Sequence, residues 1–256
     1  MTISMIVAIM RHNKIREMSM DSVCPHNNTF HCGDCRMNAL CLPLALQTKE
    51  VERLDEIIQR GKPLQKDHHI YHTGEEFSSV FAVRSGSIKS YTISNSGQEQ
   101  VTGFHLPGEI FGMDGIGQNR YTNSAVAMET SSVCEIPFNR LQELSIAIPT
   151  LQRHFFQLMS LEITGDQQLL SLLSKNTAEE RVATLLMSIS NRNFRLKLSA
   201  TRFRLPMSRA DIGNYLGLTV ETVSRVLSRF QKQALLKVDK KEVELLNLDK
   251  LRELAN

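Results

Sequence analysis

The stretch Met207–Lys232, MSRADIGNYLGLTVETVSRVLSRFQK, decides how the C-terminal part of the chain folds. It predicts two short helices joined by a tight turn at Gly217, with Thr219 as the N-cap of the second helix. At about 100° per residue, one face of the second helix collects apolar side chains and the opposite face collects polar ones. The apolar face, which suits a buried core, is formed by Val223, Val226, Leu227 and Phe230.

The polar face of the second helix carries the side chains that we expect to contact DNA: Glu221, Ser224, Arg225, Ser228 and Arg229. Two helices around a short glycine-containing turn are typical of a helix-turn-helix, which places its second helix in the major groove. There arginine can bind guanine, glutamate can accept a hydrogen bond from cytosine, and serine can reach a base edge or a phosphate. The alternative from the pattern alone is an amphipathic surface helix in any α-helical domain.

Charge separates this region from the rest of the chain. From Arg192 to Lys241 there are 12 lysine or arginine residues and 3 acidic residues, a local net charge of +9, whereas the whole chain carries only +3. A basic domain attached to an acidic body is typical of nucleic-acid binding. The charge pattern therefore favours double-stranded DNA as the partner of this region.

The residues around the turn also resemble a known family. The run DIGNYLGLTVETVSR is very similar to the DNA-reading segment of the fumarate-and-nitrate-reduction regulators, the oxygen-sensing branch of the cyclic-AMP-receptor-protein superfamily. Similar stretches recur at FAVRSGSIKSYTI, TGFHLPGEI, VCEIPF and LLSKNTAEER. The resemblance covers nearly all of the chain from Cys32 onward.

The resemblance implies an α+β fold with an N-terminal sensor β-roll, similar to a jelly roll, a long dimerisation helix and a C-terminal winged helix-turn-helix. It implies a homodimeric transcription regulator, activator or repressor, with RNA polymerase as a further partner, and not an enzyme. It also implies that Glu221, Ser224 and Arg225 form the recognition triple and that the DNA half-site resembles TTGAT.

Length and composition are compatible with this organisation. At 256 residues and 41% hydrophobic content, the chain can bury the cores of two domains. No run approaches the roughly 18 apolar residues of a membrane-spanning helix. The opening TISMIVAIM is short and lacks a preceding basic region, so we expect no secretory signal. Five cysteines without export signals favour a reducing cytoplasm, where cysteines serve as ligands or reactive groups.

Three of the five cysteines lie close together in the sequence. Cys32, Cys35 and Cys41 form a C-x2-C-x5-C pattern, so their thiolates can converge on one centre. Iron–sulfur clusters are commonly held by four thiolates, and the residues alone leave Cys24 or Cys134 as the fourth ligand. Taken alone, Cys134 in the expected strand VCEIPF is most simply a small buried side chain. For Cys32, Cys35 and Cys41, the alternative to a ligand role is that they are incidental buried thiols.

The resemblance selects Cys134. In the oxygen-sensing regulators, three N-terminal cysteines at this spacing and one distant cysteine before an EIPF-like sequence hold a [4Fe–4S] cluster. It thereby implies Cys32, Cys35, Cys41 and Cys134 as the iron ligands of this chain. The lead-in PHNNTFHC differs from the shorter, cysteine-bearing one of the family, so Cys24 stays a competitor.

Two alternatives to a cluster-containing regulator stay open. One is a regulator of the same fold whose cysteines act as thiol switches or bind zinc together with His26 or His31. The other is an enzyme whose cysteines bind a catalytic metal. Against the enzyme, the sequence contains no H-E-x-x-H motif, no nucleophile elbow and no carboxylate pair with a clear role.

The middle of the chain changes from a helix pattern to strand patterns. Residues 48–60, TKEVERLDEIIQR, predict a helix, and short alternating runs with glycine turns from Leu64 to Phe138 predict a small β-barrel or jelly roll. In relatives that bind a cyclic nucleotide, an acidic residue is followed several positions later by an Arg-Ser or Arg-Thr pair. Here Glu109 is present but Arg120 precedes Tyr121, so we expect no cyclic nucleotide.

Pro149 opens a long helix that we expect to end near Ser174. Its three- and four-residue steps predict a dimer seam formed by Phe156, Met159, Ile163, Asp166, Leu170 and Leu173. A buried helix without a partner chain is the alternative. Asp166 favours a marginal dimer, because two carboxylates that meet across a two-fold axis oppose association. The resemblance agrees, since the dimer helix of the family carries an Asp in this context.

The sequence therefore predicts four parts: a cysteine-rich segment over 1–47, a sensor β-roll over 48–148, a dimerisation helix over 149–176 and a winged helix-turn-helix over 177–256. Thr177 and Glu180 predict a capping box at the first helix of the last part, and ALLKVDKKEVELLN predicts the wing hairpin. By resemblance, cluster assembly under anaerobiosis promotes dimerisation and binding to a palindromic operator, and oxygen reverses both.

Overall fold

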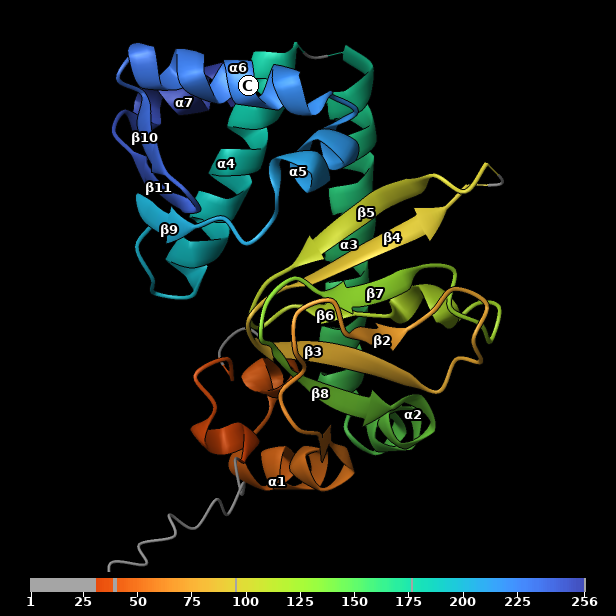
Figure 1. The fold of residues 1–256 in the computed structure, drawn as a ribbon. Coiled ribbons are helices and arrows are strands. Elements are labelled where there is room, and N and C mark those ends of the chain that lie inside the picture. The colour runs from red at the N-terminus through yellow and green to blue at the C-terminus, as the bar shows by residue number, and fades with distance from the viewer. Residues whose placement is uncertain (1–30, 39–40, 95, 176, 256) are drawn as a thin grey trace, which may run out of the picture. The chain divides into compact units, whose positions relative to one another are not determined.

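Two antiparallel sheets form the predicted sensor domain (Figure 1). The computed structural model describes residues 31–38, 41–94, 96–175 and 177–255. One sheet has the strand order β1-β8-β3-β6 and the other has the order β2-β7-β4-β5, which confirms the β-roll. The strands are β1 Gln59–Arg60, β2 His69–Tyr71, β3 Ser79–Ser85, β4 Ile88–Ile93, β5 Glu99–His105, β6 Ile110–Phe111, β7 Ser124–Ala127 and β8 Ser132–Pro137.

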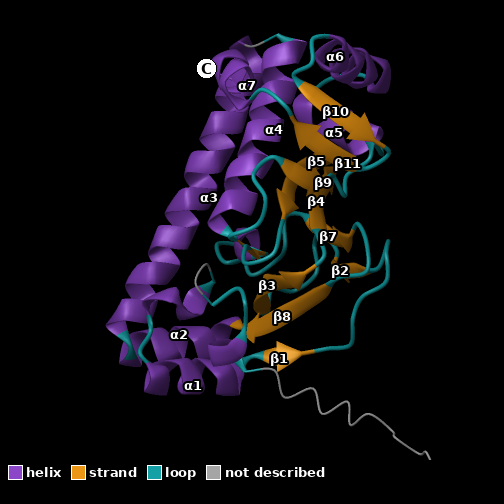
Figure 2. Ribbon diagram, turned by 90° about the vertical axis from the view of Figure 1, so that its left-hand side faces the viewer, coloured by secondary structure: helices purple, strands orange, loops and turns teal. Residues whose placement is uncertain are grey.

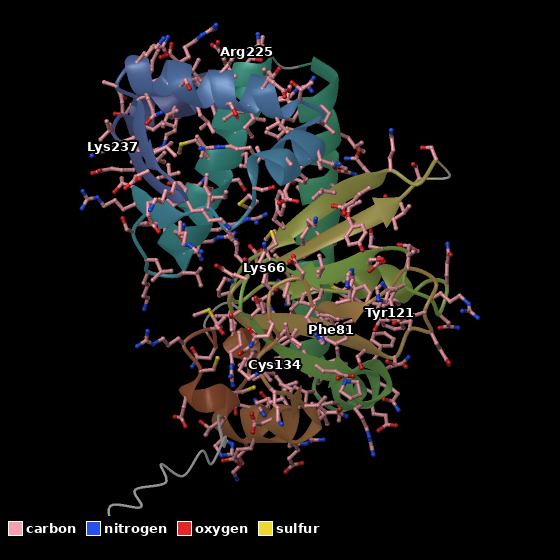
Figure 3. All side chains as sticks on the ribbon, viewed as in Figure 1. Lys66, Phe81, Tyr121, Cys134, Arg225 and Lys237 are labelled. Carbon is pink, nitrogen blue, oxygen red and sulfur yellow. The ribbon has the colours of Figure 1, made fainter. Side chains whose placement is uncertain are left out.

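Aromatic side chains pack in the core of the β-roll. The rings of Tyr71 and Tyr121 stack with centroids 3.8 Å apart, and those of Phe81 and Phe111 stack at 5.4 Å. Figure 3 labels two of these four residues, Phe81 and Tyr121. Such pairs are worth about 0.5–1.5 kcal/mol beyond the area they bury. Because Phe81 lies on β3 and β3 pairs with β8, this core also holds the strand that carries Cys134.

Three helices flank the sheets (Figure 2): α1 Thr48–Ile57, α2 Phe138–Ala147 and α3 Pro149–Lys175. α1 and α3 confirm the predicted helices, although the chain leaves α1 at Ile57 to enter β1. α2 was not predicted, because its ten residues lie between a strand pattern and the proline that opens α3. Among the described helices, none combines the length and the apolar composition needed to cross a membrane.

The C-terminal part contains the predicted helix-turn-helix and wing. Its helices are α4 Ala178–Arg195, α5 Arg209–Leu216, α6 Val220–Lys232 and α7 Leu248–Ala255, and its strands are β9 Arg202–Arg204, β10 Leu236–Asp239 and β11 Glu242–Leu245. The hairpin β10–β11 is the predicted wing. The structure adds β9, which pairs with β11 and was not predicted. A three-residue strand has too few residues to produce an alternation pattern.

Local capping explains why the helix-turn-helix forms where it does. Thr219 accepts a hydrogen bond from the amide of Thr222 at 3.2 Å, which confirms it as the N-cap of α6. Gly217 adopts φ 62°, a left-handed conformation that glycine accepts without cost, and so ends α5. All four predicted core residues of α6 are buried. The capping box of Thr177 and Glu180 opens α4 as predicted.

Helix α5 is docked on the hairpin β4–β5 of the sensor domain. The side-chain oxygen of Asn214 accepts from the amide of Val101 at 2.6 Å, and its nitrogen donates to the carbonyl of Glu99 at 2.7 Å. Lys89 forms ion pairs with Glu99 at 2.6 Å and with Asp211 of α5 at 3.0 Å. The predicted helix-turn-helix is therefore attached directly to the strand pair β4–β5.

Candidate functional site

Four thiols from two distant parts of the chain line one cavity. Cys32 lies in the 3-10 helix η1, Cys32–Asp34, Cys35 follows it, and Cys41 directly precedes a second one, η2, Leu42–Ala45. Cys134 comes from the middle of β8 and is labelled in Figure 3. All four are free cysteines. The structure thus brings together the four cysteines that the family resemblance implies as ligands.

The other candidate ligands from the sequence are placed differently. Cys24 and His26 lie outside the described residues. His31 does not line the cavity; its Nδ1 lies 2.9 Å from Oδ2 of Asp55. Within the described ranges, no three His, Cys, Asp or Glu side chains lie close enough together to hold a metal ion. The four thiols surround a common space without converging on a single point.

A charged pair lies beside Cys32. The amide of Cys32 donates to Oδ1 of Asp55 at 2.7 Å, and Arg60 forms an ion pair with the same carboxylate. Nη2 of Arg60 also donates to Sγ of Cys32 at 3.3 Å. Arg60 lies on β1, directly opposite Cys134 in the β1–β8 pair. Neither Asp55 nor Arg60 is marked by a sequence motif, and only the pairing of β1 with β8 brings Arg60 to the thiols, so the sequence alone does not predict them.

Burial favours the protonated form of three of the thiols, those of Cys32, Cys41 and Cys134, unless a ligand replaces the proton. Burial raises the pKa of Cys32, and a hydrogen bond with Asp55 raises it further. Burial also raises the pKa of Cys41 to about 12. The pKa of Cys134 is raised by burial, against the opposing charges of Arg60 and Arg84. Because thiols bind metals as thiolates, filling this site must release protons.

The cysteine segment packs on the N-terminal half of α3. Leu42, directly after Cys41, is fully buried in one core with Leu151 and Phe155 of α3. Nε2 of His154, also on α3, lies 3.3 Å from the carbonyl oxygen of Cys41. A change in the position of Cys41 would therefore alter the packing against α3.

The predicted seam on α3 is largely exposed in the single chain. Phe156, Ile163 and Leu170 leave 59%, 56% and 68% of their surfaces exposed, and Asp166 is exposed between them. Large apolar side chains repeated along one helix are unusual on a monomer surface and typical of an interface with another chain. The alternative of a helix that is fully buried without a partner chain is wrong, because these three side chains are exposed.

A second cavity, of about 240 Å³, lies in the β-roll beside α3. The residues that line it are Tyr71, Ser90, Thr102, His105, Phe111, Gly112, Met113, Asp114, Asn123, Met159, Glu162, Ile163 and Asp166. None of these lining residues is a lysine or arginine, and three are acidic. Glu109 and Arg120, the two residues compared above with the cyclic-nucleotide pattern, do not line this cavity. Glu109 pairs with Arg192 at 3.3 Å, and Arg120 donates to the carbonyl of Gly74 at 2.7 Å.

The loop beside this second cavity supplies its own anion. Oδ2 of Asp114 accepts hydrogen bonds from the amide and hydroxyl of Thr122, both at 2.8 Å, and from the amide of Asn123 at 2.9 Å. Converging backbone amides of this kind are a common way to hold an anion. Here the carboxylate of Asp114 already occupies them.

The predicted DNA-contacting residues lie on one exposed face of α6. Glu221, Ser224, Arg225 and Ser228 are all exposed, and Figure 3 labels Arg225 on this helix. Nη2 of Arg225 donates to Oγ1 of Thr222 at 3.1 Å, which leaves its other guanidinium nitrogens for a base edge. The face thus presents the donors and acceptors that major-groove recognition uses.

Two further basic residues border the recognition face. Arg229, one turn after Arg225, forms an ion pair with Glu179 of α4. That pairing suits a backbone-positioning role better than direct contact with a base. Lys237 is exposed on the first strand of the wing, β10, and is labelled in Figure 3.

Comparisons with known proteins agree with this architecture. A model of the Crp-like helix-turn-helix domain matches residues 180–254, and a model of the cyclic nucleotide-binding domain matches residues 61–146. The solved structure of FixK2 from Bradyrhizobium japonicum is similar with a TM-score of 0.71 and 32% identity; the match covers 78% of this chain and 98% of that one.

Relatives of named function are more similar still. The transcriptional activator protein FnrA of Stutzerimonas stutzeri is 52% identical over 85% of this chain and 89% of its own length. The fumarate and nitrate reduction regulatory protein of Escherichia coli K12 is 50% identical over 88% of this chain and 90% of its own. With this identity over most of both chains, a sensor β-roll and a helix-turn-helix, the chain belongs to the CRP/FNR family of DNA-binding transcription regulators, in the branch of the Fnr and Anr proteins.

Proposed function

We propose that this protein is an oxygen-responsive transcription regulator in which Cys32, Cys35, Cys41 and Cys134 hold a [4Fe–4S] cluster. The observation that carries the proposal is the meeting of these four thiols around one cavity, although Cys134 lies far from the others in the sequence. Cluster assembly without oxygen favours the dimer, and the dimer binds a two-fold-symmetric operator with TTGAT-like half-sites. Contact with RNA polymerase and a cytoplasmic location complete the proposal.

The donor set fits this group. Four thiols are the ligand set of a [4Fe–4S] cluster. A single zinc ion would hold its sulfurs at about 2.3 Å, which requires ligands that converge on one point. The described residues offer no such convergence. When bound, the cluster would supply the reactivity toward oxygen on which the proposed sensing depends.

The coupling to dimerisation runs through the residues next to Cys41. Leu42 is buried against Leu151 and Phe155, and His154 contacts the carbonyl of Cys41. A fixed position of Cys41 therefore fixes the packing beneath the first half of α3. The exposed apolar side chains of the seam favour pairing of two such helices, and Asp166 opposes it. An equilibrium balanced in this way can be shifted by a modest change in packing.

Cyclic-nucleotide binding is not part of the proposal, although the matching domain model carries that name. A cyclic nucleotide is an anion. The second cavity contains no cationic side chain among its lining residues and places Asp114, Glu162 and Asp166 on its wall. These carboxylates would repel the phosphate.

The test is anaerobic purification followed by absorption spectroscopy, iron and sulfide analysis and sedimentation before and after exposure to air. We expect a broad absorption at the blue end of the visible range that bleaches in air, together with a shift from dimer to monomer. Cys134→Ser is expected to lose the iron, whereas Cys24→Ser, the matched control, is expected to keep it. A colourless, zinc-containing or metal-free protein that pairs equally with and without oxygen would contradict the proposal and favour a zinc or thiol-redox regulator.

A further inference from the structure

Asp55 and Arg60 connect the two parts of the chain that supply the thiols. Asp55 lies on α1 and binds the backbone amide of Cys32. Arg60 lies on β1, opposite Cys134, and reaches back to Sγ of Cys32. The ion pair between Asp55 and Arg60 closes the link.

The ion pair between Asp55 and Arg60 is partly shielded from water, which strengthens the attraction between the two charges. The side chains of Asp55 and Arg60 are only 14% and 18% exposed. An ion pair that is largely buried is less screened by salt than one on the surface. Within the pair, the carboxylate holds the guanidinium in place over the sulfur of Cys32.

A guanidinium in this position has a defined chemical effect on a group held by thiolates. Hydrogen bonds to the sulfurs and nearby positive charge stabilise the more negative, more reduced state of an iron–sulfur cluster. Oxidation by oxygen removes an electron and is therefore disfavoured. Lysine would keep the charge, but it lacks the planar fork that lets arginine bind a carboxylate and a sulfur together.

We propose that Asp55 and Arg60 are positioning residues that hold Cys32 beside Cys134 and that the N–H donated by Arg60 lengthens the lifetime of the cluster in air. The part of this inference that concerns the cluster lifetime rests on the proposed function. The placement of Cys32 does not depend on iron and can be tested separately.

The first experiment compares Arg60→Met, Arg60→Lys and the matched control Arg53→Met in air-free protein. Arg53 carries the same charge on α1, is exposed and lies two residues from Asp55. We expect Arg60→Met to bind iron and sulfide as wild type does but to lose its visible absorption in air roughly threefold faster or more, with a lower reduction potential. Arg60→Lys should restore part of the lifetime, and Arg53→Met should match wild type.

The second experiment uses cluster-free, reduced protein and measures alkylation of each cysteine by iodoacetamide with mass spectrometry. Cys32 is 7% exposed in the structure. We expect Asp55→Ala to raise the alkylation rate of Cys32 about threefold or more, because loss of the hydrogen bond from the Cys32 amide releases the segment and exposes the thiol, while the melting temperature of the protein is unchanged.

The outcomes separate the two proposals. Wild-type protein without iron would contradict the proposed function, and the alkylation of Cys32 in Asp55→Ala would still decide whether Asp55 positions it. Iron-containing Arg60→Met protein that bleaches at the wild-type rate would overturn the role of Arg60 in cluster lifetime. An unchanged alkylation rate of Cys32 in Asp55→Ala would overturn the positioning role.

Discussion

Nε2 of His154 lies 3.3 Å from the carbonyl oxygen of Cys41, so one contact ties the long helix α3 to the segment that carries three of the four thiols. Because a carbonyl can only accept, Nε2 carries the proton in this contact. We expect His154→Leu to keep the iron content but to reduce the ratio of dimerisation constants with and without oxygen by roughly threefold, since a lost hydrogen bond of this kind costs about 0.5–1.5 kcal/mol. Sedimentation in both atmospheres measures the ratio. Gln152→Ala, exposed on the same helix, is the control, and an unchanged ratio in His154→Leu would exclude this contact as a coupling route.

Arg225 is expected to read a guanine in each half-site. Replacing it with alanine should weaken operator binding by about 1–3 kcal/mol per half-site and relax the preference at that base pair. Lys250→Ala removes a charge from α7 and serves as the control at the same salt concentration. Binding curves on the intact palindrome and on one with the guanine substituted measure both effects. Equal affinity of wild type and Arg225→Ala would rule out the base contact.

Asp166 is expected to limit pairing of the two α3 helices. It is exposed in the seam between Ile163 and Leu170, and desolvation raises the pKa of its carboxyl. Asp166→Ala should lower the dimer dissociation constant in air by about tenfold or more, because two desolvated carboxylates no longer meet at the interface. Sedimentation equilibrium measures this constant. Gln167→Ala should leave it unchanged; if both variants behave as wild type does, the carboxylate does not face its twin.

His105 predicts a specific loss of stability in acid. Burial, together with the charge of Arg192, lowers its pKa to about 3. Because the unfolded chain takes up a proton near pH 6.5 and the folded chain does not, stability falls as the pH drops below about 6.5. From pH 7 to pH 5 this one group should cost about 2 kcal/mol of unfolding free energy. Urea titrations should show a shallower pH dependence in His105→Gln, and parallel dependences in both proteins would refute the assignment.

Asp114 is expected to act as a built-in anion for the loop beside the second cavity. Asp114→Ala leaves the amides of Thr122 and Asn123 without their acceptor, which should cost about 1–3 kcal/mol of stability. Inorganic phosphate should then raise the melting temperature of the variant more than that of wild type, because the freed donors can bind it. Thermal melts with phosphate and with chloride at equal ionic strength measure the difference. Identical shifts in the two proteins would show that the amides do not form an anion site.

Much of the fold could be predicted because several signals agreed locally. The apolar face of α6, the N-cap at Thr219, the turn at Gly217 and the capping box at Thr177 each depend on neighbouring residues, so the sequence shows them directly. The β-roll was predicted from alternation and glycine turns. α2 and β9 were missed because both are short.

The candidate site was predictable only in part. Resemblance selected Cys134, but Asp55 and Arg60 have no motif, and their place beside the thiols arises from the pairing of β1 with β8. The interaction of His154 with Cys41 joins residues far apart in the chain. Neither contact leaves a periodic signal, so only the folded structure reveals them. The sequence predicted Arg229 only as a DNA contact, and its ion pair with Glu179 is seen only in the structure.

The attachment of α5 to the hairpin β4–β5 has a consequence for attempts to recombine modules between relatives. Asn214 fits the backbone of Glu99 and Val101, and Asp211 fits Lys89. A hybrid that joins this β-roll to the helix-turn-helix domain of another protein would keep Lys89, Glu99 and Val101 but lose their partners Asp211 and Asn214. Engineering a new operator preference is therefore safer by exchanging the outward side chains of α6 than by exchanging whole domains.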